Sequence, residues 1–486
     1  MISDEQAGFR NGFSTTDNAL ILDTLVRERL KKGRKTYCAM VDFSQANDST
    51  NREALWFKLS KMGVSERFLK VTRSMYTHSS FSVRTRKGAA KEVDSTAGLL
   101  QGAQNSAALF IHYIADLVKF IEDTEGIHAP TLGDLEISSL LFADDICFLS
   151  TTVLGLQKML NRLAVYCEEW GLRVNVQKTK IIIFKKGARP TKVEKWRYKG
   201  EKIEVVRKFK YLGVNFAYNG TWTKHVQESR RKLKMGCCKL AKFSSRLKDC
   251  PLKLSLRLLD TLISPAALYG AEIFAWSKGM EGLEALERNH IRAILGLHKG
   301  TPGSALNLVL GRVGWTEKAK LRALNYWHKT VTKGKNTLLA KVLEYSREGA
   351  EKGKENWIGN VKGQLQRMGL SYIWEKPGAI SRKKFKKIVG KRLKDISMQN
   401  QMEKTGGLPS VKHLVKGREG RTELWNRIRN LESRFKRRIA FKILLQAHED
   451  AIERDGMDKK CISCKATLRS TVLHHRLAGV WPECRQ

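Results

Sequence analysis

The spacing of apolar residues over the first part of the chain predicts helices that alternate with short strands. Apolar residues recur three and four positions apart, as on one face of a helix, over 18–33, 104–120 and 153–170. Short continuous apolar runs, which suit buried strands, occur at 36–43 and 180–184, and a turn-linked pair of strands is predicted over 202–216. The sequence therefore predicts an α+β fold in which helices back one small sheet.

Two adjacent carboxylates interrupt an apolar segment at 140–150, which reads LLFADDICFLS. Because Asp and Ala are poor strand formers, Asp144 and Asp145 are expected in a tight turn between two strands. Two like charges held together favour a divalent cation between them. Asp42 lies near the end of the 36–43 run, where an antiparallel neighbour would let it face the hairpin tip. Carboxylates from more than one strand are what two-metal phosphoryl transfer requires.

Each of these features also has a plainer explanation. An adjacent Asp pair is common in exposed turns, and an acid at the end of a strand often only caps it. The flanking apolar runs and the charge of the whole chain favour the catalytic interpretation of Asp42, Asp144 and Asp145 taken together.

The charge of the chain points to a polyanionic partner. Lys and Arg number 90 against 48 Asp and Glu, which gives a formal net charge of +42, spread along the sequence. An apolar content of 42% argues against a disordered chain. No apolar run reaches the length of a spanning helix, and a membrane partner is not expected. A general basic protein, such as a ribosome-associated one, would leave the acidic hairpin unexplained.

Beyond residue 216 the sequence is mostly helical and rich in cations. Basic runs over 184–245 and 376–439 are interleaved with aromatic residues, which suits a groove that follows a nucleic-acid backbone. We expect salt-sensitive, largely sequence-independent binding to RNA and DNA. Glycine and proline cluster near 187–190, 300–303 and 406–409, which are the predicted domain boundaries.

The nine cysteines suggest reduced thiols, and the last three form a separate group. The x₂ spacing of Cys461 and Cys464 suits a zinc turn, and His474, His475 and Cys484 follow. A Zn²⁺ site formed by Cys461, Cys464, His474 and Cys484 and a tail of unliganded thiols are about equally compatible with this pattern.

Six segments in a fixed order resemble the reverse transcriptase of non-LTR (LINE-type) retrotransposons. They are AGFRNGFSTTD (7–17), VDFSQANDS (41–49), GLLQGAQNSAALFIHYIADL (98–117), FADD (142–145), WGLRVNVQKTKIIIF (170–184) and KYLG (210–213). The resemblance implies a right-hand polymerase palm followed by a mostly helical thumb and a basic C-terminal region. It implies an RNA-directed DNA polymerase that extends a DNA primer or target on an RNA template, with dNTPs and two Mg²⁺ ions, in target-primed reverse transcription.

The resemblance also assigns roles to individual residues. Asp42, Asp144 and Asp145 would hold Mg²⁺, and Lys178 would act near the leaving pyrophosphate. The substrate-binding residues would be Phe43, Asn47, Gln101, Gly102 and Phe142, and the primer grip would be Tyr211, Leu212 and Gly213. From the residues alone, Lys178 is better explained as a solvated surface lysine, and 211–213 nearly as well as a plain β-turn.

Four domains are predicted on this basis. Residues 1–186 would be partial fingers and palm, and 187–300 the end of the palm with the primer-grip hairpin and the helical thumb. Residues 301–455 would be a basic, mostly helical region, and 456–486 the Cys/His tail.

The chain departs from the family pattern at several points. Asn47 stands where the family has an aromatic residue that walls off the sugar 2′ position. The loop over 101–107 lacks the two prolines and the acid of the family, and it should be less rigid. An upstream fingers segment and an endonuclease are not recognised, so we expect an N-terminally truncated element copy.

These departures keep other functions open. The alternative is a catalytically inactive nucleic-acid-binding remnant or a host-captured binding protein. A group II intron-type maturase shares the palm, but the thumb and the cysteine tail are more similar to the LINE type. A target-primed reaction implies localisation to the nucleus and cytoplasm.

Overall fold

The chain divides into two compact units in a computed structural model. The structure describes residues 2–77, 79–86, 88–100, 102–187, 193–246, 252–334, 336–407, 452–455 and 458–461. The first unit comprises Met1–Lys224 and Thr330–Gly363, and the second comprises His225–Lys329 and Gln364–Gln486. The chain therefore leaves the first unit after residue 224 and returns to it for one short stretch.

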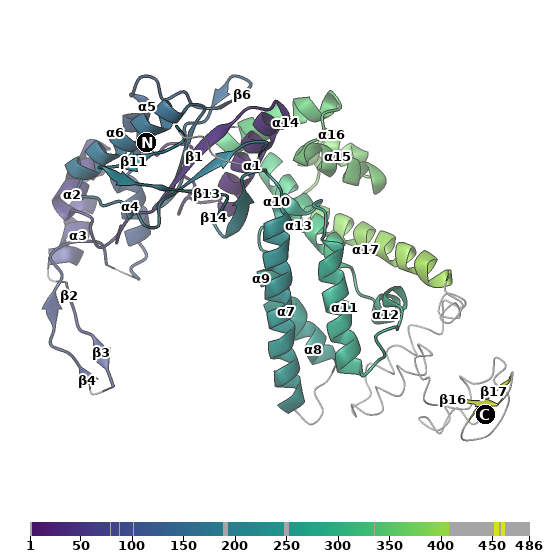
Figure 1. Cartoon of the computed structure of the whole chain (residues 1–486). Coiled ribbons are helices and arrows are strands. Elements are labelled where there is room, and N and C mark those ends of the chain that lie inside the picture. The colour runs from purple at the N-terminus through teal and green to yellow at the C-terminus, as the bar shows by residue number, and fades with distance from the viewer. Residues whose placement is uncertain are drawn as a thin grey trace. The chain divides into compact units, whose positions relative to one another are not determined.

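A five-stranded sheet with the strand order β13-β10-β1-β9-β8 forms the centre of the first unit. Figure 1 labels two of its strands, β1 and β13. Its strands are β1 (Thr36–Val41), β8 (Ser139–Phe142), β9 (Asp145–Ser150), β10 (Lys180–Phe184) and β13 (Glu204–Val206). All neighbours are antiparallel except β10 and β13. The predicted strands and the acidic hairpin are confirmed.

Five of the described helices contribute to the hydrophobic core on one face of this sheet. They are α2 (Arg52–Lys61), α3 (Glu66–Thr77), α4 (Ser106–Tyr113), α5 (Leu117–Glu122) and α6 (Val153–Glu169). Tyr37, Ala39 and Val41 of β1 point into this core, as alternate residues of a strand must. The amphipathic pattern predicted for 153–170 is confirmed by α6.

The prediction of a single helix over 104–120 is wrong, because this segment forms two helices, α4 and α5. The Tyr113 carbonyl accepts a hydrogen bond from Lys58 Nζ at 2.7 Å, while the Leu117 amide donates to Ile114. The carboxylate of Asp116 accepts hydrogen bonds from Lys58 Nζ at 2.7 Å and from the Tyr166 hydroxyl at 2.6 Å. The helix breaks where these contacts with α2 and α6 replace helical hydrogen bonds.

Helix α1 (Thr15–Lys31) lies near β8 and begins with a capping box. The Ser14 amide donates to the Asp17 carboxylate at 2.9 Å, which satisfies an amide at the start of the helix. Asn18 Nδ2 donates to the Leu141 carbonyl of β8 at 2.8 Å. Helix α14 (Leu338–Glu351), from the returning stretch, packs against α1. Helix α1 therefore links the acidic hairpin to a segment more than 300 residues away.

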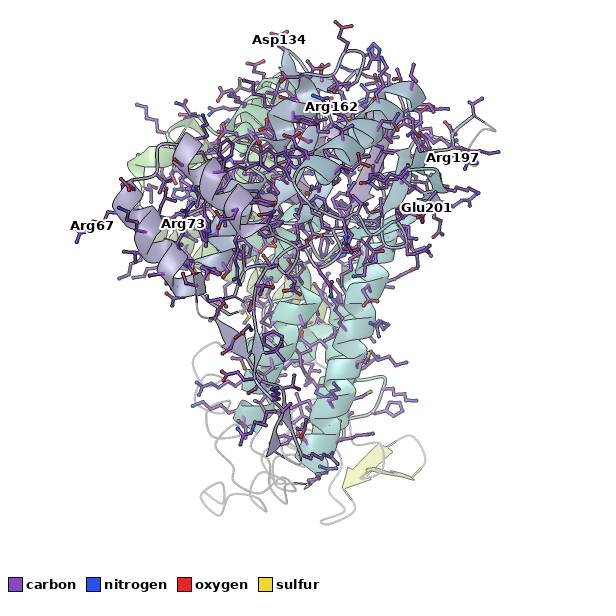
Figure 2. The ribbon with its side chains drawn as sticks, turned by 90° about the vertical axis from the view of Figure 1, so that its left-hand side faces the viewer. Arg67, Arg73, Asp134, Arg162, Arg197 and Glu201 are labelled. Atoms are coloured by element: carbon purple, nitrogen blue, oxygen red, sulfur yellow. The ribbon has the colours of Figure 1, made fainter. Side chains whose placement is uncertain are left out.

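The remaining strands of the first unit form two-stranded ribbons. The longest ribbon follows α3 (Glu66–Thr77) and pairs β2 (Ser80–Phe81) with β5 (Val93–Asp94), and β3 (Arg84–Thr85) with β4 (Gly88–Ala89). The others pair β6 (Thr131–Leu132) with β7 (Leu135–Glu136), β11 (Arg197–Tyr198) with β12 (Glu201–Lys202), and β14 (Lys208–Tyr211) with β15 (Val214–Ala217). Figure 2 shows Arg67 projecting outward from α3. The strand pair predicted over 202–216 is thus three strands, of which β13 joins the central sheet.

The second unit is mostly helical in its described part. Its helices are α7 (Thr223–Arg246), α8 (Leu252–Leu258), the π-helix η1 (Leu259–Ile263), α9 (Ser264–Ala267), α10 (Ala271–Phe274), α11 (Glu281–Leu295), α12 (Gly303–Leu310), α13 (Trp315–Val331), α15 (Trp357–Arg367), α16 (Ser371–Glu375), η2 (Pro377–Ala379) and α17 (Arg382–Gly406), of which α7, α13 and α15 cross a unit boundary. A hairpin of β16 (Ile452–Asp455) and β17 (Asp458–Cys461) follows. The predicted fold class, an α+β palm followed by a mostly helical region, is confirmed.

Buried charge holds part of the second unit together. The buried guanidinium of Arg312 lies 2.8 Å from Asp260 and 2.5 Å from the buried carboxylate of Glu287. A charge that is desolvated in this way needs a close counter-charge, and Arg312 has two. Among the residues that the structure describes, no helix has the length and apolarity to cross a membrane.

Candidate active site

The three predicted catalytic acids converge at one end of the central sheet. Phe142 pairs with Asp145, which leaves Ala143 and Asp144 as a two-residue turn between β8 and β9. Val41 of β1 faces Ile146 of β9, so the same register brings Asp42, the next residue, level with Asp145. Acids that are 102 and 103 positions apart in the sequence therefore meet at one end of the sheet.

The electrostatics of this tip are those of uncompensated carboxylates. Burial, followed by the negative charges of Asp144 and Asp42, raises the pKa of Asp145 to about 6. Asp42 Oδ2 is buried and accepts no hydrogen bond. The Nζ atom of Lys178 lies 3.5 Å from Asp42 Oδ2 and supplies one positive charge. Positive charge is therefore favoured here.

A short turn after α6 carries Lys178 to this position. The Asn175 amide donates to the Asp42 carbonyl at 2.8 Å, and the Asp42 amide donates to Thr179 Oγ1 at 3.2 Å. Asn175 Oδ1 accepts from the Lys178 amide at 3.1 Å, which closes the turn. The side chain of Lys178 is 69% exposed, so its ammonium is free to move.

The acids fit a magnesium ion in the chemistry of their donors. Carboxylate oxygens are the ligands that Mg²⁺ prefers. A cation would also interact favourably with the buried Oδ2 of Asp42, which accepts no hydrogen bond, and with Asp145, whose pKa is raised. In the described ranges, no group of three or more His, Cys, Asp or Glu side chains is already gathered closely enough to hold a metal ion. Asp42, Asp144 and Asp145 are the residues that would hold it.

The predicted substrate-binding residues lie around the acids in different environments. Phe43 is 5% exposed and packs in the core, whereas Asn47 is exposed. Phe142 is half-buried, with its ring centre 6.5 Å from that of Phe9. Gly102 is exposed at φ +86°, and apart from its chain neighbours no described residue has an atom within 4 Å of where a Cβ would lie. Gln101 lies outside the described residues.

The loop that precedes Gly102 is tied to the loop that carries Asn47. The Leu99 amide donates to the Asn47 carbonyl at 2.8 Å. The guanidinium of Arg52 donates to the carbonyls of Ser95 at 2.6 Å and Gly98 at 2.8 Å. These hydrogen bonds fix the backbone of residues 95–99, which leads into the loop over 101–107 that lacks the family's prolines.

The predicted primer-grip residues form the hairpin between β14 and β15. Tyr211 pairs with Val214, and Leu212 and Gly213 form the turn with φ of +46° and +82°. Positive φ at both positions is the pattern of a two-residue hairpin turn. Tyr211 is buried, and its hydroxyl donates to the Leu140 carbonyl at 3.4 Å, which attaches the hairpin to β8.

The structure does not describe the side chains of the predicted zinc ligands. Cys464, His474 and Cys484 lie outside the described residues, as does His475, and only the backbone of Cys461 is described, in β17. The Zn²⁺ site stays a prediction.

Sequence reasoning missed three residues that contact the acidic hairpin. Gln6 accepts a hydrogen bond from the Ala143 amide, Gly8 lies against the backbone of the turn, and Asn18 donates to Leu141. Gly8 falls within the recognised segment 7–17 and Gln6 directly precedes it, which was the available signal. Their contacts span more than 120 residues and leave no periodic pattern.

Residues 1–216 match the family described as reverse transcriptase (RNA-dependent DNA polymerase). This part of the chain is therefore similar in sequence to the reverse transcriptases. Within that class it resembles the enzymes of non-LTR (LINE-type) retrotransposons, and the resemblance inferred from the six motifs is confirmed. Members of this family generally use Mg²⁺.

Several similar proteins come from insect retrotransposons. The probable RNA-directed DNA polymerase from transposon BS of Drosophila melanogaster is 24% identical over 303 residues, which cover 60% of this chain and 33% of that protein. The Pol polyprotein of the type-2 element R2DM of the same species is 26% identical, over 44% of this chain and 21% of its own length. The type-1 R2 polyprotein of Popillia japonica is 25% identical, over 61% and 42%. The matches thus span less than half of each relative.

A partial likeness to a solved structure was also found. The apo telomerase of Candida tropicalis, truncated from its C-terminal domain, shares 16% identity, covering 43% of this chain and 39% of that chain, with a TM-score of 0.32. A likeness this low supports no argument about this chain.

Proposed function

We propose that this chain is an RNA-directed DNA polymerase of a LINE-type retrotransposon, which extends a DNA 3′-end on an RNA template in target-primed reverse transcription. The observation that supports this most directly is the convergence of Asp42, from the end of β1, with Asp144 and Asp145, from the β8–β9 hairpin. The match of residues 1–216 to the reverse transcriptase family supports it independently.

The three carboxylates would hold two Mg²⁺ ions. When bound, the metals supply charge stabilisation and activate the primer 3′-hydroxyl for attack on the nucleotide. Oδ2 of Asp42 accepts no hydrogen bond, so it could bind a metal ion without losing one. With Asp42 neutralised by metal, the mobile ammonium of Lys178 would be released toward the leaving pyrophosphate, where a cation stabilises developing charge.

Other residues would bind nucleotide and primer. Gly102 leaves open space in which a template or nucleotide backbone can approach closely. Asn47, a smaller and polar residue, would face the sugar 2′ position, so discrimination between dNTPs and rNTPs is expected to be weaker than an aromatic wall gives. The Leu212–Gly213 turn would contact the primer end.

Nucleic acid is the expected macromolecular partner, and the basic helix α17 supports this. Eight exposed cations lie between Ser381 and Asp395, with no acid among them. Such a surface follows phosphates without reading sequence. A reaction on chromosomal DNA would take the protein to the nucleus as well as the cytoplasm.

A second candidate is a nucleic-acid-binding remnant without catalysis. Asn47 and the altered loop over 101–107 favour it, because both lie where the nucleotide would bind. Such a remnant would still bind nucleic acid through its basic surface but would not catalyse nucleotide incorporation.

Primer extension on an RNA template with dNTPs and Mg²⁺ tests the proposal. The control is Asp144→Asn, which removes one charge at an exposed turn position and preserves the backbone. Incorporation by the wild type that is absent from the variant supports the polymerase. Equal signals from both would refute it, and salt-sensitive RNA binding with no incorporation by either would identify the remnant.

A further inference from the structure

The N-terminal segment 5–8 runs beside the acidic hairpin and pairs with it. The Leu141 amide donates to the Glu5 carbonyl at 2.9 Å, and the Ala7 amide donates to the Leu141 carbonyl at 2.9 Å, as a parallel bridge between Gln6 and Leu141. This backbone contact leaves the side chain of Gln6 next to the Ala143–Asp144 turn.

The side chain of Gln6 is 2% exposed and makes two specific contacts. Its Oε1 accepts hydrogen bonds from the Ala143 amide at 2.9 Å and from the Gly8 amide at 2.8 Å. A buried amide oxygen that joins two backbone segments restricts both, because losing either bond would leave a buried donor unpaired. Gln6 therefore fixes the turn at its first residue.

The turn needs such support because its backbone is strained. Ala143 adopts φ of +55°, a left-handed conformation that costs a residue with a side chain about 1 kcal/mol. The hydrogen bond from its amide to Gln6 holds the residue in this conformation. Asp144 follows immediately, so the direction of its carboxylate depends on the same dihedral angles.

Gly8 shows how closely the segment approaches the turn. A Cβ atom at Gly8 would lie 2.3 Å from the Ala143 nitrogen and 2.8 Å from the Phe142 carbonyl carbon. Both are backbone atoms, which cannot rotate away as a flexible side chain would. Any side chain at residue 8 would therefore displace the hairpin that carries Asp144 and Asp145.

We propose that Gln6 is a positioning residue for metal binding, which holds the Ala143–Asp144 turn so that Asp144 and Asp145 face Asp42. Gln6 contacts neither substrate nor metal, and it acts through the Ala143 amide. This inference rests on the proposed polymerase function for its catalytic consequence. The effect on the turn itself does not depend on that function.

The test compares Gln6→Met with the wild-type chain. Methionine keeps the length of the side chain and removes the acceptor. We expect about tenfold faster amide hydrogen exchange at Ala143, the equivalent of one lost buried hydrogen bond. We also expect the Mg²⁺ concentration for half-maximal primer extension to rise about tenfold, with a smaller change in the KM for dNTP.

Two further variants show whether the turn is responsible. Gln6→Glu keeps an acceptor for both amides and should restore slow exchange at Ala143. Gly8→Ala should also raise the Mg²⁺ concentration for half-maximal primer extension, because its Cβ atom would press on the backbone of the same turn. The matched control is Gln157→Met, which also removes an amide oxygen that accepts a backbone amide, that of Arg197 at 3.0 Å, on a distant ribbon.

The outcomes separate this inference from the proposed function. Unchanged exchange at Ala143 and an unchanged Mg²⁺ requirement in Gln6→Met would overturn it, and so would an equal effect of Gln157→Met. A wild-type chain that does not extend primers at any Mg²⁺ concentration would refute the polymerase proposal. In that case faster exchange at Ala143 in Gln6→Met, restored by Gln6→Glu, would still support the positioning role, and its absence would contradict it.

Discussion

The ammonium of Lys178 lies 3.5 Å from Oδ2 of Asp42, an oxygen that is buried and accepts no hydrogen bond. The side chain of Lys178 is 69% exposed. An ion pair with one exposed partner contributes little to stability, so this pair supplies charge to the site more than it stabilises the fold.

Lys178→Ala should therefore reduce catalysis and leave the fold intact. Loss of a cation that stabilises the leaving pyrophosphate is expected to lower the rate of extension by about 10²-fold. The melting temperature should change little. Single-turnover primer extension measures the rate. The control is Lys180→Ala on β10, which removes the ion pair with Glu204 at 2.7 Å, and a similar rate loss in that variant would contradict a specific role.

Asp145 should make the stability of the chain depend on pH. Its pKa in the folded protein is about 6, above the ordinary carboxyl value of 3.8. The folded state thus binds the proton more tightly, so ionised Asp145 opposes folding. This penalty is absent below about pH 4, grows as the pH rises and is complete above about pH 6.

Asp145→Asn should accordingly melt about 2 °C higher than the wild type at pH 7.5 without divalent ions, a small shift because the residue is partly exposed. At pH 4 the two should melt alike. Adding Mg²⁺ should raise the melting temperature of the wild type more than that of the variant. Equal melting temperatures at pH 7.5 would show that the acids do not repel one another in the folded chain.

The acidic hairpin could be predicted from the sequence because it depends on a local pattern. Two short apolar runs set its strands, and Ala143 and Asp144 suit a turn between them. The position of Asp42 rested on an assumed antiparallel pairing, because β1 ends at Val41 and β9 begins only at Asp145. Lys178 was placed by resemblance, since nothing in its local pattern separates it from a solvated lysine.

Contacts that join distant side chains could not be predicted in this way. Gln6 and Ala143 are 137 residues apart, and Lys58 and Asp116 are 58 apart. The second contact explains why the prediction of one helix over 104–120 is wrong. The apolar periodicity continues through 104–120, but the buried Lys58 binds Tyr113 and Asp116 at the point where the helix breaks. The return of 330–363 to the first unit was likewise invisible to composition.

The buried lysine of α2 gives a stability prediction. Lys58 Nζ donates to the Tyr113 carbonyl, to Asp116 and to the Tyr166 hydroxyl, and it lies 3.6 Å from the ring centre of Trp170. Lys58→Met keeps the bulk of the side chain but removes three hydrogen bonds and the ion pair with Asp116, so we expect a loss of about 2–4 kcal/mol in the free energy of unfolding.

Urea unfolding measures this loss, with Lys61→Met as the control. Lys61 is on the same helix but is exposed, and its ammonium lies 5.6 Å from the ring centre of Phe57. That variant should unfold within about 0.5 kcal/mol of the wild type. If both variants lost the same free energy of unfolding, the hydrogen bonds of Lys58 would not stabilise the fold more than an exposed lysine does.

The basic face of α17 predicts how nucleic-acid binding responds to salt. The exposed cations of its first half are Arg382, Lys383, Lys384, Lys386, Lys387, Lys391, Arg392 and Lys394. Phe385, Val389 and Leu393 are buried on the opposite side, which fixes the helix in the fold while the cations face solvent. Each lysine that contacts a phosphate displaces a counterion from the nucleic acid.

Replacing Lys383, Lys384, Lys386 and Lys387 together by Gln should therefore weaken binding to RNA and DNA of any sequence. The slope of log K against log salt concentration should become shallower by about 3, if most of the four contact phosphates. The same four positions changed to Arg keep the charge and should keep the slope. Fluorescence anisotropy between low and high salt measures both, and a slope unchanged in the Gln variant would mean that α17 is only a solvated face.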